Sequence, residues 1–463
     1  MNIGLPLSQD FTHFIIALVA LLALLVISEV LRKVLGLKST TTRKIVHILT
    51  GVLAFLSPYY FETNFYPAVL AMAFIPFNLL AIKMGWLKSL NEDGDTSLGT
   101  IYYPLAFLIL ALFFWGERSW ILQISMLVLG FGDAFAALVG ENAVNPHHFK
   151  LAETTKSIEG SIAMFGTSLI VLAGSLVVFH DRAKVVASMD LITLIALCVA
   201  VALVATAVEA LLSGGLDNLA IPLTVAYIFA VLEFNGTVFV QSVLIGVSLS
   251  LLMARVSFAL KFLTASGAIG TFLFGSNVFS MGGLAWTIPV LTFFVLSSVL
   301  SKIGRERKKK FDLIFEKSSQ RDVGQVIANG GVAWIMMIWY SITNEPIIFI
   351  AYLGTLAAAQ ADTWATEIGT MIRNPKPRSI LNFKPVPAGT SGGITVTGTT
   401  GGLVGALLIC VSAWAIVPDQ MLSIGIVQSF VIVGLAGLGG SLIDSFFGAT
   451  LQAMYYDPFR KKV

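Results

Sequence analysis

Two aspartates lie inside long apolar stretches of the sequence, where an ionised side chain is costly and is therefore typical of a functional site. Asp133 belongs to the run Gly132 to Gly140, whose small residues let a phosphate or a second helix approach the backbone closely. Asp362 belongs to a similar run, Ala361 to Gly369, which also contains Glu367. Both runs are candidate sites of phosphate chemistry, and tight helix packing around a paired aspartate is the alternative for Asp133.

Candidate phosphate-binding residues follow the first acidic run. Lys156 and Ser157 precede an apolar stretch, so a phosphate there could meet a lysine and the amides of a helix N-terminus. Glu159 and Gly160 belong to the same segment. Three later residues supply the hard oxygen ligands that Mg²⁺ prefers, namely Glu209, Asp217 and Asn218.

A basic cluster nearer the N-terminus comprises Arg43, Lys44 and His47. Arg43 and Lys44 are candidate nucleotide or phosphate ligands, and either Arg43 or His47 could orient an alcohol at the first site. A lone histidine in a helix is often a structural residue rather than a catalytic base, and both interpretations of His47 remain open.

The second acidic run is followed by a basic loop, beginning at Arg373, and a glycine-rich turn, the same order as in the first half. Asp444 lies in a further small-residue segment and adds a candidate Mg²⁺ ligand. The candidate phosphate ligands of this half are Arg321, Arg378, Lys384, Gly389, Thr390, Ser391, Gly392 and Gly393. Aligning the two acidic runs pairs Asp133 with Asp362, so an internal duplication is one explanation of the shared order.

The elements that must position these residues are membrane-spanning helices. Of 463 residues, 56% are hydrophobic and 12% are charged, and the mean hydropathy is +0.86, whereas about a quarter of a soluble domain is charged. Apolar runs of roughly 17 to 25 residues recur along the chain, and helices of that length satisfy their own backbone hydrogen bonds across a bilayer. We expect an all-α polytopic membrane protein with about fifteen transmembrane helices in two fused bundles, residues 1–256 and 257–463.

Charge predicts the orientation of these helices. Basic loops separate most successive pairs of apolar spans, so nearly all of them can face the cytoplasm together. The first span, Phe14 to Val30, follows Asp10 and precedes Arg32 and Lys33, which places the N-terminus outside. The dense basic run from Arg305 to Lys310 is interpreted as a cytoplasmic anchor. We expect the candidate sites to face the cytoplasm, across a bacterial cytoplasmic membrane.

The first half resembles the phytol kinase and dolichol kinase group of polyprenol kinases, which is related more distantly to phosphatidate cytidylyltransferases. The matching elements are Arg43-Lys44 with His47, Gly132 to Gly140, Lys156 to Ser161, and Glu209 with Asp217-Asn218. The last element departs from the family, because Leu216 stands where a first aspartate is expected. The resemblance implies transfer of a phosphoryl group, commonly from CTP, to the hydroxyl of an isoprenoid alcohol.

The second half resembles the phytyl-phosphate kinase family of membrane proteins, formerly a domain of unknown function. The matching elements are Thr264 to Ala268, Gly270 to Gly275, Ser297-Ser298 with Ser301-Lys302, Arg321 to Gly330, Ala361 to Gly369, Gly389 to Gly393 and Gly440 to Gln452. This resemblance implies phosphorylation of a prenyl monophosphate to the diphosphate.

Residues and resemblance together predict a bifunctional kinase that uses Mg²⁺ and a nucleoside triphosphate, expected to be CTP, to phosphorylate an isoprenoid alcohol twice. The expected catalytic residues are His47, Asp133, Glu209, Asp362, Glu367 and Asp444, and the expected Mg²⁺ ligands are Asp133, Asp217, Asp362 and Asp444. The expected partners are the lipid bilayer, the alcohol and its monophosphate, the nucleotide and downstream prenyltransferases, with no nucleic acid. A cytidylyltransferase that forms a CDP-lipid and a secondary transporter are the alternatives.

Overall fold

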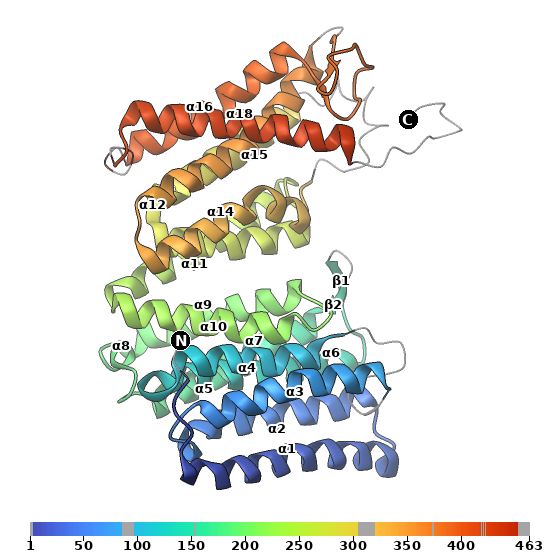
Figure 1. Cartoon of the computed structure of the whole chain (residues 1–463), viewed down its shortest axis with the longest axis vertical. Coiled ribbons are helices and arrows are strands. Elements are labelled where there is room, and N and C mark those ends of the chain that lie inside the picture. The colour runs from blue at the N-terminus through green and yellow to red at the C-terminus, as the bar shows by residue number, and fades with distance from the viewer. Residues whose placement is uncertain are drawn as a thin grey trace. The chain divides into compact units, whose positions relative to one another are not determined.

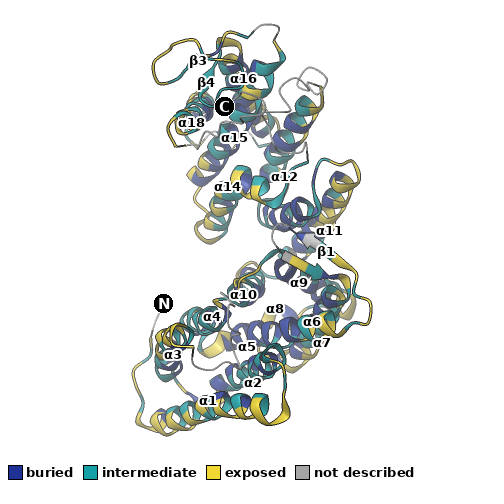
Figure 2. Ribbon diagram, turned by 90° about the vertical axis from the view of Figure 1, so that its right-hand side faces the viewer, coloured by how far each residue is buried: buried dark blue, intermediate teal, exposed yellow. Residues whose placement is uncertain are grey.

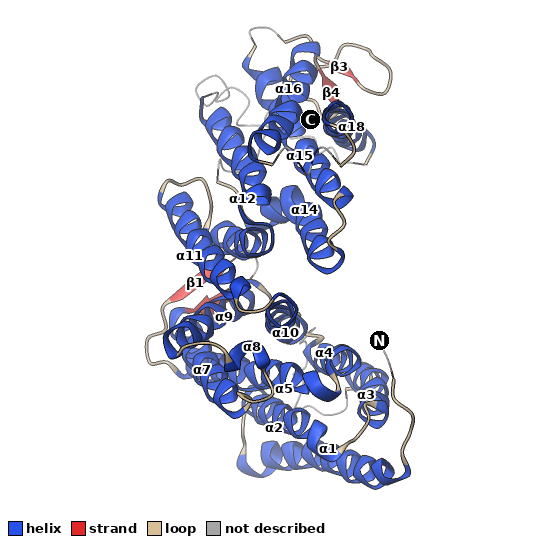
Figure 3. Cartoon of the chain, turned by 90° about the vertical axis from the view of Figure 1, so that its left-hand side faces the viewer, coloured by secondary structure: helices blue, strands red, loops and turns tan. Residues whose placement is uncertain are grey.

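The computed structural model describes residues 3–85, 97–151, 154–303, 320–372, 375–417, 419, 421 and 423–451. Nearly all the regular structure in it is helical (Figure 3), which confirms the all-α expectation. The chain divides into two compact units, Met1–Leu244 and Ile245–Val463. Helix α11 (Val238–Ala259) contains both this division and the boundary near residue 256 that the sequence suggests.

The first unit is a bundle of long helices that run roughly parallel or antiparallel to one another (Figure 1). Its helices before α11 are α1 (Ser8–Leu35), α2 (Ser39–Tyr60), α3 (Phe65–Lys83), α4 (Gly99–Phe114), α5 (Ser119–Leu127), α6 (Ala134–Asn142), α7 (Ile158–Val178), α8 (Lys184–Ala187), α9 (Leu191–Leu211) and α10 (Asp217–Asn235). A 3₁₀ turn (Gly116–Arg118) precedes α5, and a π-helical segment (Val128–Asp133) joins α5 to α6. Strands β1 (His148–Leu151) and β2 (Thr154–Ser157) form an antiparallel hairpin between α6 and α7.

The continuous segment Gly116–Asn142, here called the central segment, lies in the middle of the first unit. Within its apolar stretch 72% of the residues are buried, against 11% for α1. Figure 2 shows the same contrast, with exposed residues gathered along α1. Exposed apolar residues such as Val19 and Val26 give α1 the lipid-facing surface of a peripheral span. Asp133, in contrast, lies where helices pack against helices.

Asp10 ties the start of α1 to the turn between α2 and α3. Its fully buried carboxylate accepts hydrogen bonds from the backbone amides of Glu62 and Thr63, at 3.1 and 3.2 Å, and from the Thr63 hydroxyl at 3.3 Å. Buried carboxylates need such donors, because an ionised group without partners is costly away from water. These bonds hold the N-terminal end of α1 beside the C-terminal end of α2.

The second unit contains α12 (Ala265–Ile303), α14 (Val323–Thr343), α15 (Ile347–Met371), α16 (Val396–Ile416), α18 (Ile426–Thr450) and the paired strands β3 (Arg378–Ser379) and β4 (Gly393–Ile394). Helix α15 packs along both α16 and α18. Gly283 interrupts α12 with a φ of 57°, which favours glycine, and divides this helix into two arms. In the core, the Tyr352 hydroxyl donates to the Trp286 carbonyl oxygen at 2.5 Å.

Within the described residues, 12 helices are long and apolar enough to cross a membrane, fewer than the fifteen or so expected from the sequence. The difference has three sources. Basic and hydroxyl residues on α2 lower its hydropathy, α4 has only 16 residues, and the two arms of α12 count as one helix. Helix α2 has a lower mean hydropathy than the other long helices partly because it carries Lys44 and His47, which belong to the candidate site.

We expect Asp10→Ala to lower the free energy of unfolding by about 2 kcal/mol, because the amides of Glu62 and Thr63 lose a charged acceptor. Thermal unfolding of the purified protein in detergent measures this effect. The matched control is Asp181→Ala, whose carboxylate is fully exposed. Equal midpoints for the two variants would show that Asp10 does not hold α1.

Candidate functional site

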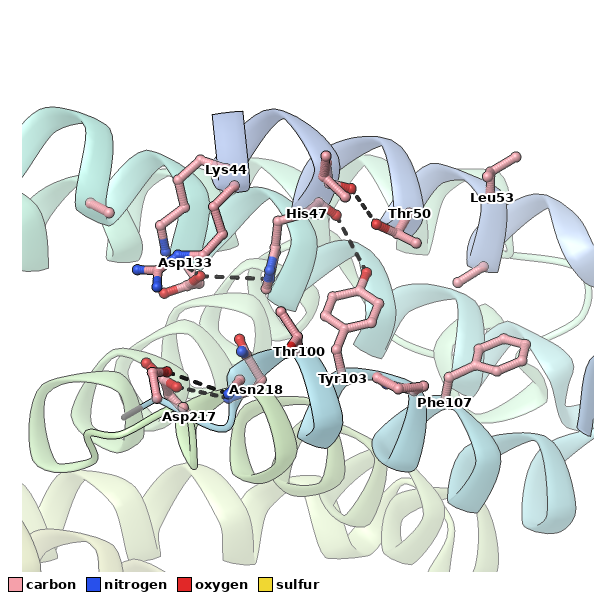
Figure 4. A pocket seen from close by; sticks show the side chains of 18 of the residues that line it. Lys44, His47, Thr50, Leu53, Thr100, Tyr103, Phe107, Asp133, Asp217 and Asn218 are labelled. Atoms are coloured by element: carbon pink, nitrogen blue, oxygen red, sulfur yellow. Dashed lines mark hydrogen bonds and ion pairs between the residues drawn. The ribbon is translucent and has the colours of Figure 1, made fainter. Parts of the chain in front are cut away.

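The first unit contains a cavity of about 1280 Å³ bounded mainly by α1, α2, α3, α4 and the central segment (Figure 4). Side chains at one end are charged or polar, and those along the rest are largely apolar. The predicted site residues that line the polar end are Arg43, Lys44, His47, Asp133, Lys156, Ser157, Gly160, Glu209, Asp217 and Asn218. The fold therefore brings together candidates from widely separated parts of the first half.

Asp133 ends the π-helical segment Val128–Asp133. Such segments interrupt the regular helical hydrogen-bond ladder and are frequent at functional sites. Two glycines let α2 approach this segment closely, since a Cβ built on Gly51 would lie 3.3 Å from the Gly130 Cα. The close approach brings the first turns of α2 next to the Asp133 carboxylate.

Asp133 and Lys44 form a buried ion pair. The Lys44 Nζ donates to the Asp133 Oδ2 at 2.7 Å, and the two side chains are only 8% and 9% exposed. The His47 Nε2 lies 3.6 Å from the same oxygen, and Figure 4 shows both α2 side chains extending toward the carboxylate. One carboxylate thus meets two groups from one face of α2.

Tyr103 of α4 contacts both the ring and the backbone of His47. Its ring meets the His47 ring edge-on with centroids 4.7 Å apart, and its hydroxyl donates to the His47 carbonyl oxygen at 3.4 Å. Sequence reasoning missed Tyr103, because an aromatic residue inside an apolar run carries no local signal that separates packing from function.

A second ion pair joins the β1–β2 hairpin to the end of α9. The Lys156 Nζ donates to the Glu209 Oε1 at 2.5 Å, and the Glu209 side chain is buried. Burial alone would lower the pKa of Lys156, but the negative charges of Glu209, Asp217 and Asp133 raise that pKa above its usual value. Lys156 therefore stays cationic at neutral pH and faces the same cavity as these carboxylates.

Asp217 and Asn218, at the start of α10, present oxygens to the cavity. Within the described residues Asp217 forms no ion pair, and its carboxylate accepts a hydrogen bond from the Asn218 amide at 3.0 Å. The Asn218 Oδ1 is buried without a hydrogen-bond partner there. Mg²⁺ is usually held by one or two carboxylates together with phosphate oxygens, and this pair fits that demand. No described group of three or more His, Cys, Asp or Glu side chains could hold a metal by itself.

Ser157 and Glu159 have structural contacts at the base of the hairpin. The Ser157 hydroxyl caps α7 by accepting a hydrogen bond from the Gly160 amide at 3.1 Å. The Glu159 carboxylate accepts from the His147 backbone amide at 3.0 Å and lies 2.7 Å from the His147 Nδ1. Ser157 remains in the cavity wall, whereas Glu159 is not among the lining residues.

The carboxylates of the second unit have different surroundings. The Asp362 carboxylate interacts with the Ser441 side chain and with the like charge of Asp444. Glu367 accepts from the Ser301 hydroxyl at 2.8 Å. Within the described residues neither Asp362 nor Asp444 forms an ion pair, so these two carboxylates are not matched by a lysine or arginine as Asp133 is.

The predicted cations of the second unit lie at two places. The Arg321 guanidinium sits before α14, over the rings of Phe293 and Phe294, at 5.3 and 5.8 Å from their centroids. Burial lowers the pKa of Arg321 to about 10, so it stays cationic at neutral pH. Arg378 donates to the Phe383 carbonyl oxygen at 3.1 Å within the α15–α16 loop. The same loop holds Lys384, Gly389, Thr390, Ser391, Gly392 and Gly393, whereas Arg373, Gln452 and Arg305 to Lys310 lie outside the described residues.

The two units share one local arrangement. In each, an acidic helix is followed by a pair of antiparallel strands and then by a helix that a hydroxyl caps. In the second unit the Thr395 hydroxyl accepts from the Gly398 amide at 3.0 Å, as Ser157 accepts from Gly160 in the first.

The contacts between the acidic helix and the capped helix also have the same register. A Cβ built on Gly160 would lie 2.8 Å from the Ala136 carbonyl oxygen, and one built on Gly398 would lie 2.7 Å from the Ala365 carbonyl oxygen. Each alanine stands three residues after the aspartate of its helix. The aspartate therefore lies at the same position along the capped helix in both units.

Comparison with known proteins places the sequence in a family. The family described as integral membrane protein DUF92 matches residues 248–463. Protein PGR of Arabidopsis thaliana is 34% identical over 242 residues, which cover 47% of this chain and 81% of that protein. Phytol kinase of Synechocystis sp. is 30% identical over 209 residues, which cover 44% of this chain and 85% of that protein. The chain belongs to the phytol kinase-like family of membrane proteins.

This phytol kinase-like chain also has a relative among archaeal membrane proteins. An uncharacterized membrane protein of Methanocaldococcus jannaschii is 33% identical over 189 residues, which cover 40% of this chain and 73% of that protein. No solved structure matches the chain. The matched family and the many apolar helices together make this an integral membrane protein.

In this phytol kinase-like protein, Lys44→Met should lower the free energy of unfolding by about 3 to 5 kcal/mol, because it leaves the Asp133 carboxylate buried without its cation. The double variant Lys44→Met/Asp133→Leu should regain most of that loss. Thermal unfolding in detergent compares the variants, with the exposed Lys184→Met as control. If the single and double variants unfold at the same temperature, the ion pair does not make this contribution to the free energy of unfolding.

Gly160→Ala and Gly398→Ala should each lower the free energy of unfolding by roughly 1 to 3 kcal/mol, because the new methyl group would overlap a backbone carbonyl oxygen. The matched controls are Gly166→Ala in α7 and Gly439→Ala in α18, where a built Cβ meets nothing within 4 Å. We expect the controls to be neutral or stabilising by up to about 1 kcal/mol. Chemical denaturation followed by tryptophan fluorescence measures all four variants, and equal effects at test and control positions would refute the proposed register.

Proposed function

We propose that this protein is a bifunctional membrane kinase, which converts an isoprenoid alcohol to its monophosphate in the first unit and to its diphosphate in the second. The observation that carries the proposal is the cavity of the first unit, whose charged end continues into an apolar body. Phosphorylation of a hydrocarbon-chain alcohol requires both parts in one site. The relatives named phytol kinases support this class of substrate, since phytol is an isoprenoid alcohol.

The first transfer would take place at the polar end of the cavity. The alcohol oxygen attacks the terminal phosphorus of a nucleoside triphosphate, the bond from that phosphorus to the bridging oxygen breaks, and the nucleoside diphosphate leaves. The His47 Nε2 is buried without a hydrogen-bond partner among the described residues, so it can accept the hydroxyl proton. Lys44 and Lys156 would neutralise phosphate charge, and Arg43 would contact the leaving nucleotide.

The carboxylates of this site suit a divalent cation delivered with the nucleotide. Bound Mg²⁺ would supply positive charge between the outer phosphate oxygens. Asp217, the Asn218 amide oxygen and Asp133 are the residues placed to hold it, and Glu209 would keep Lys156 oriented toward the phosphates. Phosphates complete the coordination of Mg²⁺ in such sites, so two carboxylates and an amide oxygen from the protein suffice for this role.

The second transfer would use the monophosphate as acceptor. The aspartate register that both units share supports a related chemistry in the second one. Asp362 and Asp444 would hold Mg²⁺ with Glu367 nearby, while Arg321, Arg378, Lys384 and the Gly389 to Gly393 turn would contact phosphates. The monophosphate keeps its hydrocarbon tail in the bilayer and so stays at the membrane that contains both sites. A prenyltransferase would consume the diphosphate.

Charge supports a cytoplasmic placement of the polar ends. Basic residues of the loops favour the cytoplasmic side, which puts the N-terminus of α1 outside. The site would then open toward the compartment that contains nucleotides, and CTP is the expected donor.

Asp133→Asn and Asp362→Asn separate the two steps. With γ-labelled CTP and phytol, we expect Asp133→Asn to lose about 10²-fold or more in monophosphate formation, because a carboxylate at the phosphates is lost. The same variant should still convert phytyl phosphate to the diphosphate. Asp362→Asn should form the monophosphate and stop there. The exposed Asp181→Asn and Glu345→Gln serve as matched controls for the two units and should keep both conversions.

Different outcomes identify the alternatives. If either single variant lost both conversions while still folded at the assay temperature, one shared site would replace two. Labelled pyrophosphate released from γ-labelled CTP, with CDP-lipid formed, would identify a cytidylyltransferase. Uptake of a solute by vesicles without any chemical change would identify a transporter, whose site should lie near the bilayer midplane.

A further inference from the structure

We propose that the apolar body of the cavity is a channel that holds one isoprenoid tail of about twenty carbons, and that His13, Tyr60 and Phe61 form the end that sets this length. This inference rests on the proposed function of the first unit and specifies its substrate. It depends on the position of the cavity end that lies opposite the charged residues.

The channel runs along the length of α2, beginning at the charged end. Figure 4 shows the order along α2, with Lys44 and His47 at the charged end and Thr50 and Leu53 farther along. The opposite wall includes Phe107 of α4 in the same view. Beyond Leu53, the cavity is still lined by α2 as far as Phe61. One continuous space therefore leads from the candidate phosphate site into an apolar interior.

Helix α1 forms a second wall with one face. Ala17, Ala20 and Leu24 line the cavity, at the spacing expected for one side of a helix, whereas Val19 is 58% exposed on another side. His13, on the same face, lies near the end of α2, with its ring centroid 6.1 Å from those of both Tyr60 and Phe61. Helices α1 and α2 are therefore antiparallel. The distance of a residue from His13 along α1 is thus its distance from the far end of the channel.

His13, Tyr60 and Phe61 separate two cavities. The same three residues line a second cavity of about 420 Å³, whose mixed lining includes the carboxylates of Asp10 and Glu62. Three rings thus stand between the apolar channel and a space that contains two carboxylates. A hydrocarbon tail gains burial up to these rings and meets charged groups beyond them, so the rings form a physical stop.

The length of the channel matches a particular class of tail. Tyr60 follows His47 by 13 residues, a rise of about 20 Å at 1.5 Å per residue. A twenty-carbon prenyl alcohol has a backbone of sixteen carbons, which spans roughly 19 Å when extended, because each bond of about 1.5 Å advances the chain by about 1.25 Å. With its hydroxyl at His47, such a tail would end at the rings.

Two alanines on α1 allow the channel to be shortened in steps. Ala17 lies four residues from His13 and Ala20 lies seven, so a large ring at these positions would block the channel about 6 Å and about 10 Å before its end. The remaining length would be roughly 14 Å for Ala17→Phe and roughly 10 Å for Ala20→Phe. Those lengths accommodate fifteen-carbon and ten-carbon prenyl alcohols.

The test measures phosphorylation and binding with the same series of alcohols. Purified full-length protein is given prenyl alcohols of ten, fifteen, twenty and thirty carbons, and kcat/KM is determined for each. Binding is measured independently by competition against tritiated geranylgeraniol. Val19→Phe, which adds the same ring on the exposed side of α1, is the matched control, and the unfolding temperature checks that each variant is folded.

We expect the wild type and Val19→Phe to prefer twenty carbons. Ala17→Phe should move the optimum to fifteen carbons and Ala20→Phe to ten, each with about tenfold or greater loss for the twenty-carbon alcohol, because the displaced methylenes lose their burial. Tyr60→Ala should lose the discrimination against thirty carbons. A wild type that binds all lengths equally, or Phe variants that lower all lengths alike while remaining folded, would overturn the inference.

The binding measurement distinguishes failure of the channel inference from failure of the kinase proposal. If alcohols bind with the expected length profile but none is phosphorylated, the channel assignment stands and the kinase assignment fails. If alcohols are phosphorylated but binding shows no shift in the Phe variants, the kinase assignment stands and the channel end is elsewhere.

Discussion

The buried contact between Lys44 and Asp133 is the interaction on which the first unit depends. A carboxylate removed from water is costly, and an opposite charge at hydrogen-bond distance offsets much of that cost. The pair can form only if α2 touches the central segment, which Gly51 and Gly130 permit. Helix α2 then carries a polar surface inside a membrane protein, where α1 and the central segment pack against it and Tyr103 of α4 contacts His47. The cavity lies among these helices.

The second unit meets the same constraint by other means. Its acidic helix packs against the capped helix in the register found in the first unit, yet Asp362 interacts with Ser441 and with the like charge of Asp444, and no described lysine or arginine forms an ion pair with it. Two neighbouring carboxylates without a protein cation favour either a proton or a bound cation between them. The shared geometry thus comes with a different charge balance in the two units.

The cavity of the first unit also combines demands that conflict in a bilayer. Phosphates need cations and amides, whereas an isoprenoid tail needs apolar walls. The chain satisfies both by placing the charged groups at one end of α2 and by lining the rest of the space with α1, α3 and α4. Because α1 is largely exposed on its other side, a single peripheral helix separates the channel from lipid.

Several features were already determined by the sequence. The apolar composition required helices in a membrane, and Asp133 stood out because charge is costly there, whereas Lys44 and Lys156 stood out as basic residues beside apolar spans. The family resemblance also grouped residues that do line one cavity. The number of spans was not determined, because the polar face of α2 and the kink at Gly283 depend on neighbouring helices rather than on local hydropathy.

Only the tertiary structure decided which charges meet. Lys44 pairs with Asp133, and Glu209 with Lys156, across separations in the sequence that no local pattern encodes. The end of the channel at His13, Tyr60 and Phe61 is likewise invisible in the sequence, where His13 belongs to the first helix and Tyr60 and Phe61 lie at the end of the second. Contacts of this kind depend on helix packing, because side chains from distant segments become neighbours only when glycines and small residues let the backbones approach.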